Sequence, residues 1–233
     1  MSALSIDQIL PVVEQELQST QFIDIHTHLF MPSLGELGLW GIDELVTYHY
    51  LEAELFRSSS VKPDAYFAMT KREKADLIWR TLFVENAPVS EATRGVVAVL
   101  SALGLPTASD DLKVAREYFA AQTLEAHIGN VLKIAGLSEV VMTNDPLDPA
   151  EGPRWEAGVE RHAKFHPVLR LDGMLNKWAL NWKAIAAKGY KVDEGCSDAA
   201  VAEARRFLSD WAKRMKPVYA AVSLPDTFQF PED

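Results

Sequence analysis

The sequence predicts an α/β fold of the (β/α)8 TIM-barrel type, with only the first half of the barrel present and a large helical insertion after strand 1. Helical and strand-like segments alternate in the second half of the chain, as in a parallel sheet with right-handed crossovers. Residues 29–138 carry helical patterns and no convincing strand. Four strand-like segments occur, near residues 22, 139, 167 and 217, whereas a closed barrel needs eight.

These observations predict the domain organisation. Residues 1–233 are expected to form a partial metal-dependent (β/α) barrel that contains the helical insertion 29–138. A half-barrel leaves two open strand edges and an exposed apolar inner face, which favours association. A homo-oligomer is therefore a possible partner state, and the native protein is expected to continue beyond this half.

The composition limits the classes of function. No apolar run approaches the roughly 18 residues of a membrane span, and the N-terminus lacks the order of a signal peptide, so a cytoplasmic location is expected. The formal net charge of -10 disfavours nucleic acid or an anionic membrane as a partner. Cys196 is the single cysteine, which excludes an intrachain disulfide and a thiolate metal cluster. A small anionic substrate remains possible if local arginines, such as Arg57 and Arg170, bind it.

The N-terminal segment is expected to be a helix that packs under the first strand. Ser5 and Gln8 can form a capping box, whereas Pro11 is expected to kink the helix or delay its start. The apolar stripe consists of Ile6, Leu10, Val13 and Leu17.

The first strand, residues 22–30, carries His26 and His28 at its end. Side chains two residues apart in a strand point to the same side, so both imidazoles can face one small volume. Neutral imidazole suits zinc and other divalent metals, and a catalytic metal site uses about three protein ligands. The pair therefore predicts two ligands of a divalent metal, with the remaining ligands supplied elsewhere. The alternative is two histidines at the start of a solvated loop.

The insertion is expected to contain several capped helices. We expect a helix over residues 43–57, and a second that starts from a capping box of Thr70 and Glu73. Further helices are expected from Ser90 to Gly104, from a cap near Ser109, and over 123–135 before Gly136.

The second half of the chain is expected to continue the β/α alternation. Strands are predicted over 139–143, 167–171 and 217–222, and helices over 155–162 and 197–216, whereas the type of the segment 178–185 is less clear. Arg170 ends a strand, where its guanidinium could hold a carboxylate in bidentate fashion or form a structural ion pair with Asp172. Asp145 could hold a ligand or cap the following helix, and its Asp-Pro sequence favours the cap.

The other histidines fit structural roles on pattern alone. His49 is expected to be half-buried, and His127 lies on the apolar side of its helix. His162 and His166 have a metal-binding spacing, but a change from helix to strand between them would separate the two rings.

The motifs together resemble one family. The segment from Asp24 to Leu29 resembles the first-strand HxH of the amidohydrolase superfamily, and further features are similar to its uronate isomerase branch. Tyr48, His49 and Tyr50, followed by Arg57, resemble that branch's His-Tyr and Arg segment. Residues 141–146 are similar to its Thr-Thr-Asp-Asp-Pro stretch, with Asn144 in place of the first Asp. Residues 169–172 are similar to its Trp-Arg-Pro-Asp stretch, with Leu169 and Leu171 in place of Trp and Pro.

The resemblance covers residues 22–172 and implies a function. It implies a uronate isomerase-like enzyme that interconverts an aldose-type hexuronate, such as glucuronate, and its ketose form at a single divalent metal, commonly zinc. It implies that His26 and His28 ligate the metal, that Arg170, Arg57 and His49 orient the anionic sugar, and that Tyr50 and Arg170 are catalytic candidates. The family's late-strand carboxylate and histidine have no counterpart in the sequence.

Two other functions are compatible with the sequence. Asn144 and the generic HxH also fit another hydrolase or decarboxylase of the same superfamily. The missing late-strand ligands fit a catalytically incomplete fragment that has a structural or interaction role.

Overall fold

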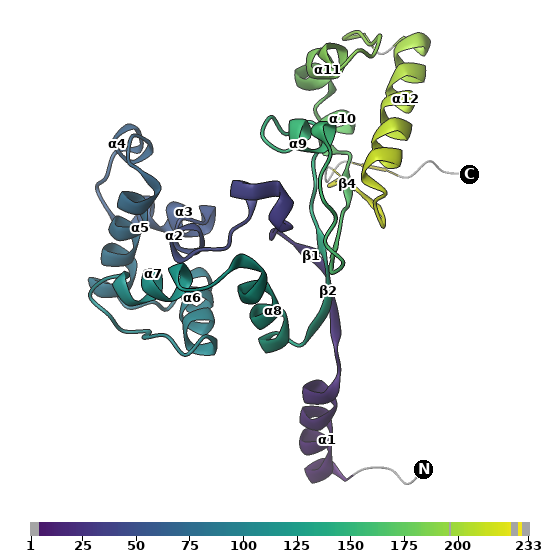
Figure 1. The fold of residues 1–233 in the computed structure, drawn as a ribbon. Coiled ribbons are helices and arrows are strands. Elements are labelled where there is room, and N and C mark those ends of the chain that lie inside the picture. Colours follow the sequence, from purple (N-terminus) through teal and green to yellow (C-terminus); the bar gives the residue numbers. More distant parts are fainter. Residues whose placement is uncertain (1–4, 196, 225–227, 230–233) are drawn as a thin grey trace. The chain divides into compact units, whose positions relative to one another are not determined.

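The computed structural model is a mixed α/β structure with small parallel sheets, and it describes residues 5–195, 197–224 and 228–229. Cys196 and most of the segment 223–233, which the sequence places beyond the last predicted strand, lie outside these residues. The chain divides into two compact units (Figure 1). The first unit combines Met1–Gly38 with Gly136–Asp233, and the second is Leu39–Ala135.

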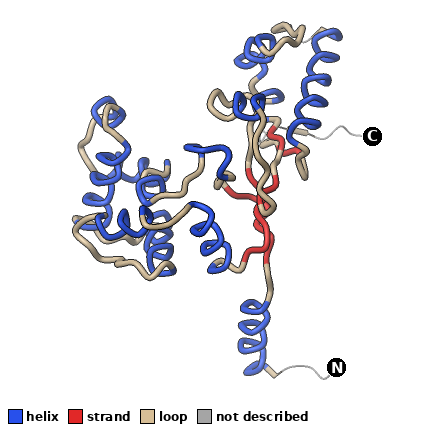
Figure 2. Tube along the Cα trace, in the orientation of Figure 1, coloured by secondary structure: helices blue, strands red, loops and turns tan. Residues whose placement is uncertain are grey.

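The first unit is built on a three-stranded parallel sheet, drawn in red in Figure 2. Its strands are β1 (Phe22–Thr27), β2 (Leu137–Met142) and β3 (Phe165–His166), in the order β1-β2-β3. Parallel pairing places the carboxyl ends of β1 and β2 at one edge, where Thr27 is opposite Met142. A register shift between Asp24 and Thr27 marks an irregularity in β1. Because such irregularities redirect side chains, this one affects the part of β1 that carries His26.

A second pair of parallel strands follows. It consists of β4 (Leu169–Arg170) and β5 (Ala220–Ala221), and a single bridge between Asn144 and Leu169 joins it to the end of β2. The predicted strands 167–171 and 217–222 are therefore correct in place but too long. Pro167 has no N–H for a ladder, and the N–H of Val168 instead donates to the side chain of Asn144 at 3.3 Å.

The predicted packing of the N-terminal helix is wrong. Helix α1 (Ile6–Ser19) contains no buried residue, and Ile6 and Leu10 are 82% and 65% exposed. Pro11 lies inside the helix and does not delay its start. The N–H of Ser5 donates to the Gln8 side chain at 3.0 Å, in agreement with the predicted box.

The remaining helices of the first unit follow the strands. A 3-10 turn covers Pro32–Leu37 (η1), and the helix predicted over 155–162 lies earlier because Gly158, at φ 91°, ends it. The segment 178–185, whose type is unclear from the sequence, is helical, and the long helix predicted from Ser197 is present. These helices are α9 (Gly152–Ala157), α10 (Asp172–Leu175), α11 (Trp178–Ala187) and α12 (Asp198–Met215). Their core includes the fully buried Trp155, Phe207 and Trp211.

The second unit is helical and has its own hydrophobic core. The core contains Leu55, Tyr66, Ile78, Trp79 and Leu100, all buried. Its elements are α2 (Ile42–Val46), α3 (His49–Ser58), α4 (Pro63–Phe67), α5 (Lys71–Trp79), η2 (Arg80–Val84), α6 (Glu91–Ala102), α7 (Lys113–Ala120) and α8 (Leu124–Ile134).

Two predicted helix boundaries in this unit are wrong. The single helix over 43–57 is two helices, because Tyr48 adopts an extended conformation at ψ 140°. The helix expected to start at Ser109 starts at Lys113, whose N–H donates to Asp111 at 2.9 Å.

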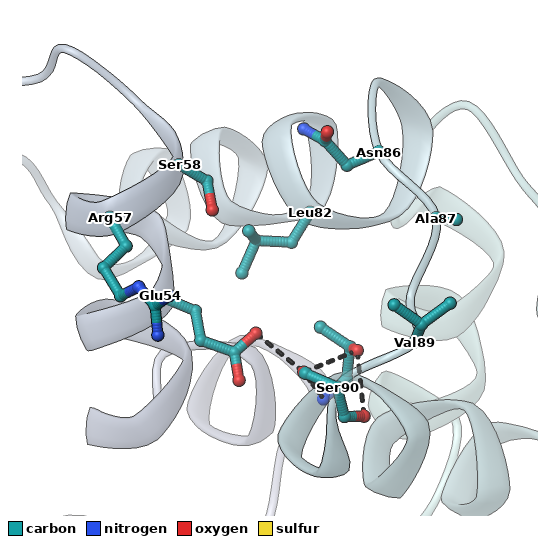
Figure 3. Close-up of a pocket in the computed structure, with 9 residues that line it drawn as sticks. Glu54, Arg57, Ser58, Leu82, Asn86, Ala87, Val89 and Ser90 are labelled. Atoms are coloured by element: carbon teal, nitrogen blue, oxygen red, sulfur yellow. Dashed lines mark hydrogen bonds between the residues drawn. The ribbon is translucent and has the colours of Figure 1, made fainter.

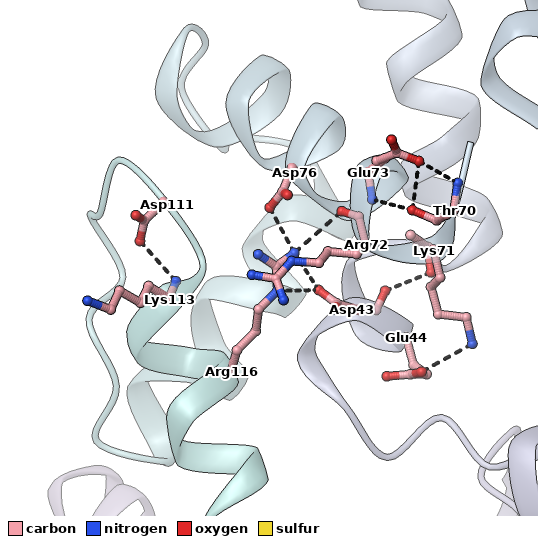
Figure 4. A network of polar contacts seen from close by, with 11 residues as sticks. Asp43, Glu44, Thr70, Lys71, Arg72, Glu73, Asp76, Asp111, Lys113 and Arg116 are labelled. Carbon is pink, nitrogen blue, oxygen red and sulfur yellow. Dashed lines mark hydrogen bonds and ion pairs between the residues drawn. The ribbon is translucent and has the colours of Figure 1, made fainter. Parts of the chain in front are cut away.

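The other caps predicted for this unit are present in the structure, and an ion-pair network lies close to one of them. Thr70 and Glu73 form the reciprocal capping box of α5, shown in Figure 4. In the same view, the guanidinium of Arg116 pairs with Asp43 and Asp76, each at 2.8 Å. The remaining caps are Ser90 and Thr123 at the starts of α6 and α8, and Gly104 and Gly136 after those helices at φ 71° and 67°.

His127 is a core residue, as predicted. It is 6% exposed and lies edge-on to Trp40 and Phe119. Its Nδ1 has no hydrogen-bond partner among the described residues, and burial lowers the pKa of the imidazole.

Candidate active site

The two histidines of the HxH motif lie together at the end of β1. Their ring centroids are 5.3 Å apart and the ring planes make an angle of 80°. Thr27, between them, is buried, and its carbonyl accepts a hydrogen bond from the Thr143 hydroxyl at 3.1 Å. This bond holds the ends of β1 and β2 together, so that both exposed imidazoles extend from a fixed strand end.

The spacing of the two rings fits one divalent metal. A metal bound at about 2.1 Å by a ring nitrogen lies roughly 3.2 Å from the ring centroid, so two tetrahedral imidazole ligands place their centroids about 5.2 Å apart. The observed 5.3 Å agrees with that value. Among the residues that the structure describes, no group of three or more His, Cys, Asp or Glu side chains could hold a metal ion. Within the described residues, His26 and His28 are the two imidazoles that lie together at this strand end.

The second histidine pair does not form a comparable site. His166 Nε2 is 2.8 Å from Glu139 Oε2, and His162 Nδ1 accepts from the backbone N–H of Lys164 at 3.1 Å. Each ring has a separate partner, in agreement with the prediction that the two would not act together.

Arg170 and Asp145 follow neighbouring strand ends of the same unit. Arg170 Nε donates to Asp172 at 3.0 Å, which is the structural ion pair considered from the sequence. Burial acts to raise the pKa of Asp172, but the bonds from Arg170 and from the Ser223 N–H lower it overall. The ion pair therefore fixes the guanidinium by one edge at the end of β4.

Asp145 caps the turn that follows it and not, as predicted from the sequence, the following helix α9, because the N-cap of α9 is Glu151. It also lies in the field of Arg170. Its Oδ1 accepts from the N–H of Leu147 at 2.8 Å. Burial raises the pKa of Asp145, and the Leu147 N–H and the positive charge of Arg170 oppose that shift. The parallel order of the strands thus brings Asp145 and Arg170 to the edge of the first unit at which β1 presents its histidines.

His49, Tyr50 and Arg57 belong to the second unit, on helix α3. His49 is exposed rather than half-buried as expected, because it is the first residue of α3 and not part of a continuous helix. Its ring lies 4.2 Å from the rings of Tyr48 and Tyr50. Tyr50, 60% exposed, and Arg57 line one hollow together with Glu54.

A second hollow of the same unit is polar and also contains Arg57 (Figure 3). It has a volume of about 390 Å³, within the range of small-ligand pockets. Glu54 points across it and accepts a hydrogen bond from the Ser90 hydroxyl at 2.7 Å, and Ser90 in turn caps α6. α3 and α6 are therefore connected by a hydrogen bond one helical turn from Arg57.

Two acidic residues near these features belong to none of the sequence motifs. Glu54 lies four residues after Tyr50 and three before Arg57, a spacing that predicts one helix face. Glu151 is buried and accepts hydrogen bonds from Asn144 and Asp145, which lie in the segment that follows β2. No periodicity marks Glu151, because its partners come from a loop and a separate helix turn.

The architecture and the site define an α/β protein with parallel strands whose carboxyl ends carry a histidine pair and an arginine. Comparison with solved structures then identifies what the chain is similar to, and confirms the resemblance to uronate isomerases. The structure matches a uronate isomerase from Bacillus halodurans C-125 with a TM-score of 0.89 and 48% sequence identity, over 100% of this chain and 55% of that one. A uronate isomerase from Thermotoga maritima matches with a TM-score of 0.64 and 15% identity, over 100% and 54% of the two chains, and shows the shared fold alone.

The chain spans about half the length of these two relatives. No protein-family model matches the sequence, and no curated protein does. None of the helices within the described residues is long and apolar enough to cross a membrane.

Proposed function

We propose that this chain is the part of a uronate isomerase that contributes two metal ligands and a carboxylate-binding arginine to the isomerisation of a hexuronate. The observation that carries the proposal is the 48% identity to a uronate isomerase along the whole chain. The ordered motifs and the paired imidazoles at a strand end support it. The proposal includes a partial (β/α) barrel as the architecture, with β1 and β2 as its first strands.

The chemistry assigns a role to each candidate of the first unit. His26 and His28 would hold a divalent metal, by ligand type zinc, which when bound supplies a Lewis acid for the sugar oxygen. Arg170 would bind the carboxylate of the sugar, since a guanidinium fork matches a carboxylate and its Nε is already fixed by Asp172.

In the second unit, the resemblance to uronate isomerases supports roles for three residues. His49 and Arg57 would bind polar groups of the sugar, and Tyr50 would take part in proton transfer between the two adjacent carbons. Tyr50 and Arg57 are suited to a shared ligand because they line one hollow.

The alternative of another hydrolase or decarboxylase rests partly on Asn144. Asn144 is fully buried, and its side-chain amide forms hydrogen bonds with Glu151 and with the Val168 N–H. An asparagine at this position therefore has a structural role, and it gives the alternative no separate support. The alternative of a catalytically incomplete fragment is distinguished from the proposal by the following experiment.

The test is to incubate the metal-loaded chain with glucuronate or galacturonate and to follow the ketose by NMR. Binding of each uronate is measured in parallel, with the double variant His26→Ala/His28→Ala as control. Turnover that this variant lacks is the expected result. Uronate binding without turnover would indicate an incomplete site, and neither binding nor turnover with any hexuronate would refute the proposal.

A further inference from the structure

Glu151 is a buried carboxylate surrounded by hydrogen-bond donors. It is 4% exposed. It accepts from Asn144 Nδ2 at 2.6 Å, from the Asp145 N–H at 3.0 Å and from Trp155 Nε1 at 2.8 Å. Three donors converge on one side chain, and two of them belong to the segment that follows β2.

The orientation of Asn144 is determined by its two partners. Its Oδ1 accepts from the Val168 N–H at 3.3 Å, so its Nδ2 must face Glu151. A reversed amide would place Nδ2 against the Val168 N–H and an oxygen against the carboxylate. The side chain of Asn144 is therefore a directed link from Glu151 to the chain immediately before β4.

Asn144 also contacts Arg170 through its backbone. The carbonyl of Asn144 accepts from the Arg170 N–H at 2.9 Å, and Asn144 forms a bridge with Leu169. Glu151 thus holds Asp145 directly and holds Arg170 through Asn144, while its own side chain stays away from solvent.

The arrangement requires an acceptor at position 151. An ionised carboxylate accepts from all three donors, whereas a protonated one would direct its O–H at a donor. Burial, together with the nearby charge of Asp145, raises the pKa of Glu151 above its ordinary value, and the hydrogen bonds from Asp145, Trp155 and Asn144 reduce that rise. An amide at position 144 supplies a fixed donor, which a carboxylate there could supply only when protonated.

We propose that Glu151 is a positioning residue: through Asn144 it sets the position of Arg170, and through the Asp145 N–H it sets that of Asp145, at the strand ends. This inference deepens the proposed function and rests on it, because Arg170 is the group assigned to the substrate carboxylate. Its test therefore includes a measurement that does not need the substrate.

The main variant is Glu151→Gln, with Glu156→Gln as the matched control. Glu156 lies on α9, the helix that Glu151 precedes, and pairs with Lys188 at 2.7 Å, outside this network. In 15N-labelled protein, E151Q should shift the backbone resonances of Asp145 and Arg170 and the Arg170 Nε signal, and E156Q should not. Glucuronate binding should weaken about tenfold in E151Q, as expected when a charged group loses its fixed position.

A second variant, Asn144→Asp, tests the direction of the link. At neutral pH it places two carboxylates side by side, so the Arg170 signals should shift as in E151Q. When the carboxylate pair takes up one proton at lower pH, the O–H of the introduced carboxyl group can replace the amide donor. The Arg170 signals should then return toward those of the wild type.

The outcomes separate the two proposals. Unchanged Arg170 and Asp145 signals in a folded E151Q, or N144D shifts that do not depend on pH, would overturn the positioning role. A loss of thermal stability with no movement of these signals would also overturn it, since it would show a packing role only. If wild-type protein does not bind glucuronate but the signals move as expected, the positioning role stands and the substrate assignment fails.

Discussion

Asp172 holds the guanidinium of Arg170 by one edge. Binding of a substrate carboxylate by Arg170 would therefore depend on the planar, two-pronged geometry of the guanidinium. Replacing it with lysine keeps the positive charge but removes the planar bidentate geometry. Arg170→Lys should therefore weaken glucuronate binding roughly tenfold or more, with the metal content unchanged. Isothermal titration and metal analysis measure the two effects, and equal binding by the variant and the wild type would argue against Arg170 as the carboxylate site.

His26 and His28 are exposed, so metal binding and folding can be separated at this pair. The double variant His26→Ala/His28→Ala should lose stoichiometric metal while its melting temperature in the metal-free state stays close to that of the wild type. Metal per chain is measured by elemental analysis after dialysis. His162→Ala/His166→Ala is the control and should retain the metal; the opposite pattern would place the site at that second pair.

His127 predicts a pH dependence of stability. Burial lowers its pKa below the ordinary value of 6.5, so at a pH under 6.5 the unfolded chain binds a proton that the folded chain excludes. The contribution of His127 to the free energy of unfolding is therefore fully present above pH 6.5. It is lost as the pH falls toward the pKa of the folded state, by at most about 1.4 kcal/mol per pH unit.

Urea unfolding between about pH 5 and 8 measures this effect on the free energy of unfolding. His127→Leu should remove the part of the pH dependence that His127 contributes. The difference between the variant and the wild type separates this part from the contributions of the other histidines. Parallel slopes for the two proteins would contradict the assignment.

At the scale of elements, the capping box of α5 is the clearest local determinant. Thr70 and Glu73 exchange hydrogen bonds of 2.8 and 3.3 Å between side chain and backbone, and Thr70 also bonds the Glu73 carboxylate through its hydroxyl. Thr70→Ala should lower the free energy of unfolding by about 1 kcal/mol, whereas Thr70→Ser should retain most of the stability that the cap contributes. Denaturant titration distinguishes them, and an alanine variant as stable as the serine variant would show that the box contributes nothing.

Element boundaries are predictable where a local signal exists. Gly104 and Gly136 follow α6 and α8 at positive φ, as their positions in the sequence indicate. The break at Tyr48 is missed because the apolar spacing on either side is helical, and no Gly or Pro marks it. The lengths of β4 and β5 are overestimated because pairing partners, and not β propensity, set the length of a strand.

At the scale of the whole molecule, the first unit exposes apolar side chains and an open strand edge. β1 lies at the edge of its sheet, with Ile23 and Ile25 55% and 69% exposed, and α1 buries none of its apolar stripe. Such surfaces favour pairing with another chain. We therefore expect the purified chain to self-associate with increasing concentration.

Sedimentation velocity measures that association. Ile25→Lys should reduce it, because a charged side chain on an edge strand disfavours pairing. Val89→Lys is the control, since Val89 is 77% exposed but belongs to the second unit. A wild type that stays monomeric at all concentrations would contradict the expectation.

The sequence alone determined the features that depend on neighbouring residues: the β1 strand with His26 and His28 two residues apart, the helix caps, and the motif order that indicated uronate isomerases. Tertiary structure alone decided which side chains meet across the chain. The link from Glu151 through Asn144 to Val168 and Arg170 depends on hydrogen bonds between distant segments. Local propensity carries no information about such contacts, because a buried donor takes whichever acceptor the fold brings to it.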